Sequence, residues 1–110
     1  MRKTNARSCQ ISLYIAGDYE TAKDIAQSFC DEVGFCVTVT PTCYVYKGGR
    51  EEGVIIGIIN YPRFPKYSHE LFDIAESLGV RLLAGLNQQS YTIEGPNQTY
   101  WYSERPEDNQ

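Results

Sequence analysis

Apolar and polar residues alternate in some parts of the chain and follow a helical spacing in others. Residues 10–16 alternate, with Ile11, Leu13 and Ile15 on one side, which predicts a β-strand with one buried face. From Ala22 to Val33 the apolar residues recur every three to four positions, which predicts an amphipathic helix of about four turns. Asp18 is suited to cap the start of this helix and Gly34 its end.

Two further strands are predicted in the middle of the chain. Residues 35–46 alternate again, but Pro41 cannot donate a hydrogen bond to a sheet, so this strand should lie at an edge or contain a bulge. The segment Lys47-Gly48-Gly49-Arg50 is typical of a hairpin turn. Residues 54–59 are apolar without alternation, which indicates a strand covered on both faces.

The second half of the chain begins with a loop over residues 60–66, which holds two prolines together with Tyr61, Arg63 and Lys66. A second amphipathic helix is expected over 68–86, capped by Ser68. Residues 91–94 and 99–102 are two short strands, either a hairpin or a fourth strand followed by an arm.

The order of elements is therefore β, α, β, β, α, β. It predicts an α+β fold, a ferredoxin-like βαββαβ sandwich with two helices on one face of an antiparallel sheet. Strands one and three would be central and strand two at an edge. We expect a polar segment over 1–9, a single domain over 10–103, and a solvated acidic tail over 104–110.

One face of this sheet would remain without a helix. Either Ile55 and Ile59, or Val54, Ile56 and Ile58, would then need another cover. A second copy of the chain is the simplest cover, because exposed apolar patches usually mark association. The sequence thus predicts a homo-oligomer.

Charge and cysteine content narrow the classes of function. A net charge of −4 argues against sequence-independent nucleic-acid binding, which needs a basic surface. No run is apolar enough to span a membrane, and the polar start of the chain is not a signal peptide. The four cysteines lack a C-x-x-C spacing and accompany one histidine, so we expect reduced thiols, a cytoplasmic location, no metal and no cofactor.

Residues for catalysis do not converge in the sequence. Catalysis commonly requires a nucleophile near a base, paired carboxylates or a metal. His69 lies in the first turn of the second predicted helix, and Glu51-Glu52 lies beside a glycine turn. Neither is near a second catalytic residue type along the chain, so the sequence predicts a protein that is not an enzyme.

Residues for binding are better represented. An anionic ligand needs a cation, a stacking surface and backbone donors at the start of a helix, and residues 61–69 contain all three. We expect a small anionic, nucleotide-like ligand at a subunit boundary lined by five residues, namely Tyr61, Arg63, Lys66, Arg50 and Trp101. Alternatively, the prolines and aromatic residues simply pack the loop.

Two other functions use the same surface. The nine tyrosines and Arg63 would suit a protein-interaction module that binds and inhibits a host protein. An exposed sheet edge would suit an assembly protein that adds a strand to a partner.

Three segments resemble a known group of small proteins. Residues 18–26, 36–41 and 44–52 (DYETAKDIA, CVTVTP and YVYKGGREE) are similar to CutA and signal-transduction PII proteins, over roughly residues 11–75. This resemblance implies a trimer with inward-facing sheets, and for the PII branch a nucleotide site between subunits. The shorter hairpin, residues 60–65 and the end of the chain depart from the family pattern.

Size, tyrosine content and the segment Asn60-Tyr61-Pro62-Arg63-Phe64-Pro65 also resemble small accessory proteins of tailed bacteriophages. This second resemblance implies a location in the host cytoplasm. It also implies an anti-defence role, in which the chain sequesters a host signalling nucleotide.

Overall fold

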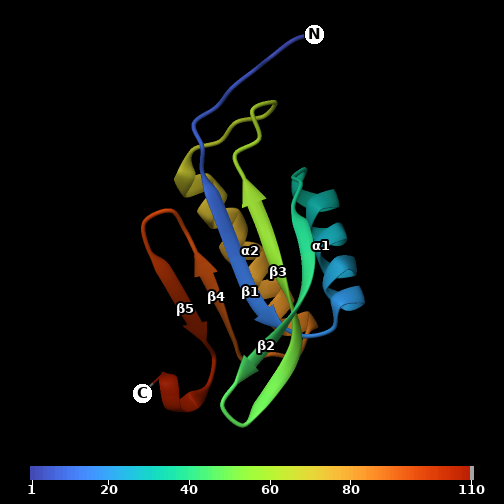
Figure 1. Ribbon diagram of the computed structural model, residues 1–110, viewed down its shortest axis with the longest axis vertical. Coiled ribbons are helices and arrows are strands. Elements are labelled where there is room, and N and C mark those ends of the chain that lie inside the picture. Colours follow the sequence, from blue (N-terminus) through green and yellow to red (C-terminus); the bar gives the residue numbers. More distant parts are fainter. Residues whose placement is uncertain (110) are drawn as a thin grey trace.

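The computed structural model describes residues 1–109 as a five-stranded antiparallel sheet with two helices on one face (Figure 1). The elements are β1 (Gln10–Ala16), α1 (Tyr19–Val33), β2 (Thr38–Tyr46), β3 (Gly49–Ile59), α2 (Ser68–Gly85), β4 (Ser90–Glu94), β5 (Thr99–Ser103) and the short helical turn η1 (Pro106–Asp108). Their spatial order is β2-β3-β1-β4-β5. The predicted ferredoxin-like sandwich is confirmed, with β1 and β3 inside, β2 at one edge, and β5 pairing with β4 as a hairpin.

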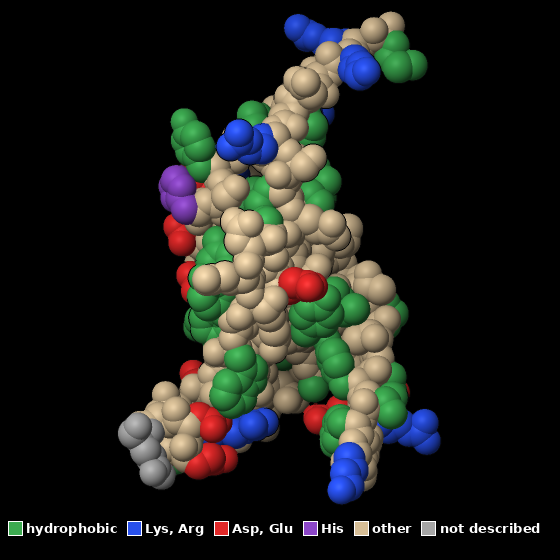
Figure 2. Space-filling view, turned by 60° about the vertical axis from the view of Figure 1, so that its left-hand side comes forward, with side chains coloured by type: hydrophobic (Ala, Val, Ile, Leu, Met, Phe, Trp, Pro, Cys, Tyr) green, Lys and Arg blue, Asp and Glu red, His purple; other side chains and the backbone are tan. Residues whose placement is uncertain are grey.

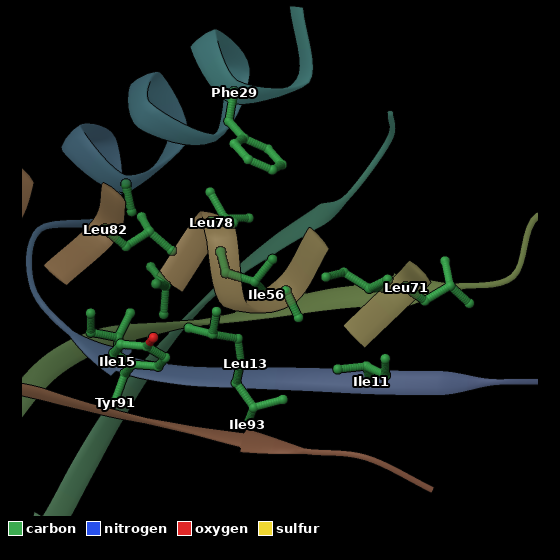
Figure 3. Packing of buried hydrophobic residues seen from close by; sticks show 14 of the residues in the cluster. Ile11, Leu13, Ile15, Phe29, Ile56, Leu71, Leu78, Leu82, Tyr91 and Ile93 are labelled. Atoms are coloured by element: carbon green, nitrogen blue, oxygen red, sulfur yellow. The ribbon is translucent and has the colours of Figure 1, made fainter. Parts of the chain in front are cut away.

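The core lies between the sheet and the helices. Leu13 of β1 is opposite Ile56 of β3 and Ile93 of β4 in the register, and all three are fully buried. Phe29 of α1 and Leu78 and Leu82 of α2 pack onto them (Figure 3). Burying each such side chain stabilises the fold by about 1.5–3 kcal/mol, so this layer fixes which face of each strand points inward.

Local signals set the ends of the first helix as predicted. Asp18 Oδ2 accepts a 2.9 Å hydrogen bond from the Thr21 N–H, and Gly34 ends the helix in the left-handed conformation at φ 71°. The second helix differs by one residue, because Tyr67 is the N-cap and Ser68 is the first helical residue. The carboxylate of Glu70 accepts a 3.0 Å hydrogen bond from the Tyr67 N–H and holds that end.

Strand β2 begins later than predicted, at Thr38 instead of residue 35. The Phe35 N–H donates to the Cys30 carbonyl at 3.3 Å, which ties this segment to the end of α1. Pro41 lies opposite Val54 in an uninterrupted register. The proline is therefore accommodated by the edge position and not by a bulge.

The two faces of β3 have different surroundings. Val54, Ile56 and Ile58 are buried against the helices. Ile55, Gly57 and Ile59 point the other way, onto a face that no element within residues 1–109 covers. Ile59 is 44% exposed there. We call this helix-free surface the open face.

The N-terminal segment and the turn after β5 lie at opposite ends of the molecule (Figure 1). Residues 1–9 extend from the end where the 60–67 loop lies. At the other end, the Glu104 N–H donates a 2.8 Å hydrogen bond to the Gln89 carbonyl, and η1 follows. In the described part of the chain, neither helix is long and apolar enough to cross a membrane.

Candidate functional site

The open face of the sheet carries aromatic and acidic side chains, whereas the face covered by the helices carries the apolar core residues. Strand residues alternate between faces, so the residues next to the buried Leu13, Ile56 and Ile93 point outward. The outward residues are Ser12, Tyr14, Ile55, Gly57, Thr92 and Glu94, with Thr38 and Thr40 of β2 and Trp101 of β5 beside them in the register.

A cleft of about 270 Å³ lies at one end of the open face, between the β2–β3 hairpin and the end of β5. Figure 2 shows the hairpin and the C-terminal turn as two projections with a hollow between them. We call this hollow the aromatic cleft and define it by the side chains of Tyr14, Tyr44, Tyr46, Glu51, Trp101 and Arg105.

Hydrogen bonds hold the tyrosines of the aromatic cleft in place. The Tyr44 hydroxyl donates to the Val54 carbonyl at 2.6 Å, and the Tyr46 hydroxyl donates to Glu51 Oε1 at 3.0 Å. Burial raises the pKa of Tyr44 to about 12, and the hydrogen bond to Glu51 raises the pKa of Tyr46. Both hydroxyls are therefore protonated donors near neutral pH, which suits orientation and binding and not a role as base.

Tyr14 links the cleft to the middle of the open face. Its hydroxyl donates to Glu94 Oε1 at 2.8 Å, and this hydrogen bond raises the pKa of Tyr14. Two Tyr–Glu pairs thus lie on the open face, one from β2 and β3 and one from β1 and β4. Each places a carboxylate beside an aromatic ring, an arrangement that attracts cations.

A second cavity, of about 550 Å³, lies at the start of α2 near the other end of the sheet. Its lining includes Arg7, Asn60, Lys66, Tyr67 and Glu70. The Asn60 side chain holds this region together, because its Nδ2 donates to the Arg7 carbonyl at 2.8 Å and its Oδ1 accepts from the Lys66 N–H at 2.9 Å. This end of the molecule is the more basic one.

The five predicted site residues divide between these two ends. Lys66 lines the second cavity and Trp101 lines the aromatic cleft. Arg63 is exposed in the 60–67 loop, and Arg50 is exposed on the β2–β3 hairpin. Arg50 lies at the start of the 11-residue strand β3 and Arg63 lies beyond its end. Because a strand rises about 3.3 Å per residue, one chain does not bring the five residues together.

Tyr61 is half-buried, and its ring packs against other aromatic residues. Its ring lies edge-on to Phe35 with centroids 5.9 Å apart, and 5.4 Å from Phe64. Hydrogen bonding to the Cys36 thiol, with burial, raises the pKa of Tyr61. The alternative considered from the sequence, that aromatic residues pack this loop, therefore describes much of what Tyr61 does.

Several residues of the aromatic cleft were absent from the predicted site, namely Tyr14, Tyr44, Tyr46, Glu51 and Arg105. A signal for the tyrosines was present in the strand alternation, because Tyr14 and Tyr44 occupy outward positions where small polar residues are usual. Nothing in the sequence pattern placed Arg105 beside Trp101. Within residues 1–109 no group of three or more acidic, histidine or cysteine side chains could hold a metal ion.

Comparisons with solved structures return two phage SAM lyases. A phage SAM lyase in the apo state superimposes with a TM-score of 0.67 at 18% identity, over 89% of this chain and 89% of that chain. A phage SAM lyase in complex with S-methyl-5'-thioadenosine superimposes with a TM-score of 0.68 at 14% identity, over 94% and 95%. No protein-family model and no curated protein matches the sequence. At these identities the likeness establishes the shared fold.

This finding overturns one prediction and supports another in part. Both similar structures are enzymes, which contradicts the prediction that the chain is not an enzyme. A lyase breaks a bond within its substrate without adding water, so it can act through binding and charge stabilisation alone, and a search for nucleophile–base pairs does not detect it. The phage resemblance is supported, whereas the CutA and PII resemblance agrees with these structures only in the ferredoxin-like fold.

Proposed function

We propose that the chain is an enzyme that binds S-adenosylmethionine and cleaves it to S-methyl-5'-thioadenosine. The observation that carries the proposal is the superposition, over nine-tenths of both chains, on a phage SAM lyase that holds S-methyl-5'-thioadenosine. The proposed site is the aromatic cleft with the adjoining open face. The proposed substrate contains an adenosine group, so it keeps the nucleoside part of the nucleotide-like ligand expected from the sequence.

The proposed reaction is simple in terms of bonds. The bond between the sulfonium sulfur and the four-carbon amino-acid chain breaks, and its electron pair moves to sulfur, which becomes a neutral thioether. The carbon that loses the sulfur forms a new bond to a carboxylate oxygen of the same substrate molecule, so the four-carbon product is a lactone and no proton acceptor is required. No water is consumed, and the leaving group is already activated by its positive charge.

The chemistry of the cleft supports such a substrate. Tyrosine and tryptophan rings can stack on adenine and attract a cation. The carboxylate of Glu51 is fixed by Tyr46 at 3.0 Å and can face a sulfonium or ammonium group. An anionic nucleotide would suit the basic cavity near Lys66 better than this cleft.

We also propose that a second copy of the chain covers the open face, with a trimer as the favoured assembly. The cleft volume of about 270 Å³ is below the range of about 300–1,000 Å³ usual for ligand sites, so a neighbouring subunit would complete the enclosure. In a phage infection the proposed role is then removal of a host metabolite by turnover, in place of sequestration.

The test is incubation of the purified protein with S-adenosylmethionine and quantification of S-methyl-5'-thioadenosine and the four-carbon product by mass spectrometry. Heat-denatured protein is the control, because S-adenosylmethionine also breaks down spontaneously. Formation of both products above this control is expected, together with thermal stabilisation by S-methyl-5'-thioadenosine. Binding without product formation would refute the lyase activity, and absence of both would refute the proposal entirely.

A further inference from the structure

Arg105 is held at the aromatic cleft by main-chain contacts. Its N–H donates to Ser103 Oγ at 3.1 Å, and its carbonyl accepts from Asn109 Nδ2 at 2.8 Å. The Ser103 hydroxyl in turn donates to Asp108 Oδ2 at 2.6 Å, which closes the turn around η1. These bonds fix the backbone at Arg105 and leave its side chain free for another contact.

The guanidinium of Arg105 lies over the Trp101 ring, 6.0 Å from the centroid, and the side chain is half-buried at the cleft wall. Among residues 1–109 the ion pairs are Lys23–Glu20 and Arg81–Glu32, so Arg105 pairs with no carboxylate of the described chain. A guanidinium has five N–H donors in a planar fork that matches a carboxylate. Stacking on Trp101 reduces its freedom before any ligand arrives.

The other charged side chain that defines the cleft, Glu51, comes from the half of the sheet that contains β2 and β3. Glu51 lies on β3, whereas Arg105 follows β5, and both line the same hollow. One anion and one cation therefore face a space walled by aromatic rings. This distribution matches a ligand that carries both a cationic centre and a carboxylate.

We infer that Arg105 binds the carboxylate of the substrate's amino-acid part and so determines specificity for substrates that carry this group. This inference rests on the proposed function. Arg105 then acts as a binding residue that distinguishes the amino-acid half of the substrate, whereas the adenosine half contacts other parts of the site.

Three ligands separate this role from general damage to the site. S-adenosylmethionine carries the carboxylate, decarboxylated S-adenosylmethionine keeps the sulfonium but lacks the carboxylate, and S-methyl-5'-thioadenosine lacks the whole amino-acid part. Because the unmodified protein would convert S-adenosylmethionine, its apparent affinity would be taken as KM from initial rates. The affinities of the other two ligands would be taken as inhibition constants in the same assay, with the full chain, for the unmodified protein, Arg105→Ala and Arg105→Lys. Arg2→Ala, at the opposite end of the molecule, removes the same charge and serves as the matched control.

Arg105→Ala should weaken binding of S-adenosylmethionine by at least about tenfold, the loss expected for a charged hydrogen-bonded pair. It should leave the affinities for the other two ligands within about twofold, by the same reasoning. Arg105→Lys should restore part of the loss, because it keeps the charge without the fork. Arg2→Ala should change none of the three.

Two results would overturn the inference. One is an equal loss for all three ligands in Arg105→Ala, which would indicate a general structural role. The other is unchanged affinity for S-adenosylmethionine. If the unmodified protein binds S-methyl-5'-thioadenosine but does not prefer S-adenosylmethionine over its decarboxylated form, the inference on Arg105 fails while the adenosine site stands. If it binds none of the three, the proposed function itself has failed.

Discussion

The ring of Tyr44 covers Gly53 on the open face, and its hydroxyl donates a 2.6 Å hydrogen bond to the carbonyl of Val54. Position 53 has no room for a side chain, because a Cβ there would meet the Tyr44 ring and, at 2.6 Å, the Ile15 carbonyl oxygen. A glycine on the central strand thus allows a tyrosine from the edge strand to reach across it. The wall of the aromatic cleft depends on this contact.

Gly53→Ala should therefore displace the Tyr44 ring and destabilise the fold by about 1–3 kcal/mol, the usual cost of overpacking. The free energy of unfolding from a urea titration would measure this. Gly95→Ala is a milder comparison and should cost less, since the nearest atom to a Cβ there is the Gln98 carbonyl oxygen at 3.3 Å and the Phe72 ring atoms lie at 3.6 and 3.8 Å. Equal stability of the two variants would show that Tyr44 does not occupy this position.

Tyr44 should also make the free energy of unfolding depend on pH in the alkaline range. Burial raises its pKa from 10.0 to about 12 in the folded state. A raised pKa contributes stability that is fully present below pH 10, the unfolded value, and is lost as the pH rises toward about 12. The free energy of unfolding should fall across this window.

Tyr44→Phe should reduce that fall, although it also loses the hydrogen bond to Val54, worth about 1 kcal/mol at neutral pH. Urea titrations at several pH values between 8 and 12 would compare the slopes, with Tyr19→Phe in α1 as control. If the slope of Tyr44→Phe equals that of the unmodified protein, the Tyr44 hydroxyl does not titrate as described.

Element types and core positions follow from short-range patterns, which explains why they could be predicted. Ile11, Leu13 and Ile15 alternate, and Asp18 and Gly34 mark helix ends by their own backbone preferences. These features depend on neighbours in sequence or on which face is apolar.

The candidate site depends on register, which short-range patterns do not specify. Trp101 lies opposite Thr92 and Tyr14 is also opposite Thr92, so three strands must pair before the cleft residues meet. The predicted residues around Arg63 were chosen because they are adjacent in sequence. Side chains contributed by β1, β2, β3 and the turn after β5 were therefore missed, although the outward tyrosines were visible in the pattern.

The open face provides a test of self-association. Ile55 lies in its centre, paired with Tyr14 and Thr40, and Ile55→Asp would place an unpaired charge in any interface formed there. The unmodified protein should be an oligomer, and Ile55→Asp should be monomeric, by light scattering at the same concentration. Val80→Asp on the outer side of α2, where Val80 is 58% exposed, should leave the oligomer intact. An unchanged mass for Ile55→Asp would exclude this face as the interface.

Asn60 should be important for the stability of the 60–67 loop. Asn60→Ala removes both its bond to the Arg7 carbonyl and its bond from the Lys66 N–H. The first bond is exposed and the second part-buried, so water can replace part of each, and we expect a loss of about 1–2 kcal/mol in the free energy of unfolding. Gln89→Ala, an exposed amide whose side chain makes no such bond within residues 1–109, is the control and should be nearly neutral. A neutral effect of Asn60→Ala would show that the N-terminal segment and the loop are held by other contacts.

Glu51 should distinguish cationic from neutral ligands. S-adenosylmethionine carries a sulfonium charge, whereas S-methyl-5'-thioadenosine is a neutral thioether, so a nearby carboxylate should favour only the former. Glu51→Gln keeps the shape and the ability to accept a hydrogen bond from Tyr46, which lies 3.0 Å away, but removes the charge. We expect binding of S-adenosylmethionine to weaken by about tenfold, with binding of S-methyl-5'-thioadenosine nearly unchanged. Glu107→Gln in the exposed C-terminal turn is the matched control for net charge, and a similar loss in both variants would mean that Glu51 acts only through the overall field.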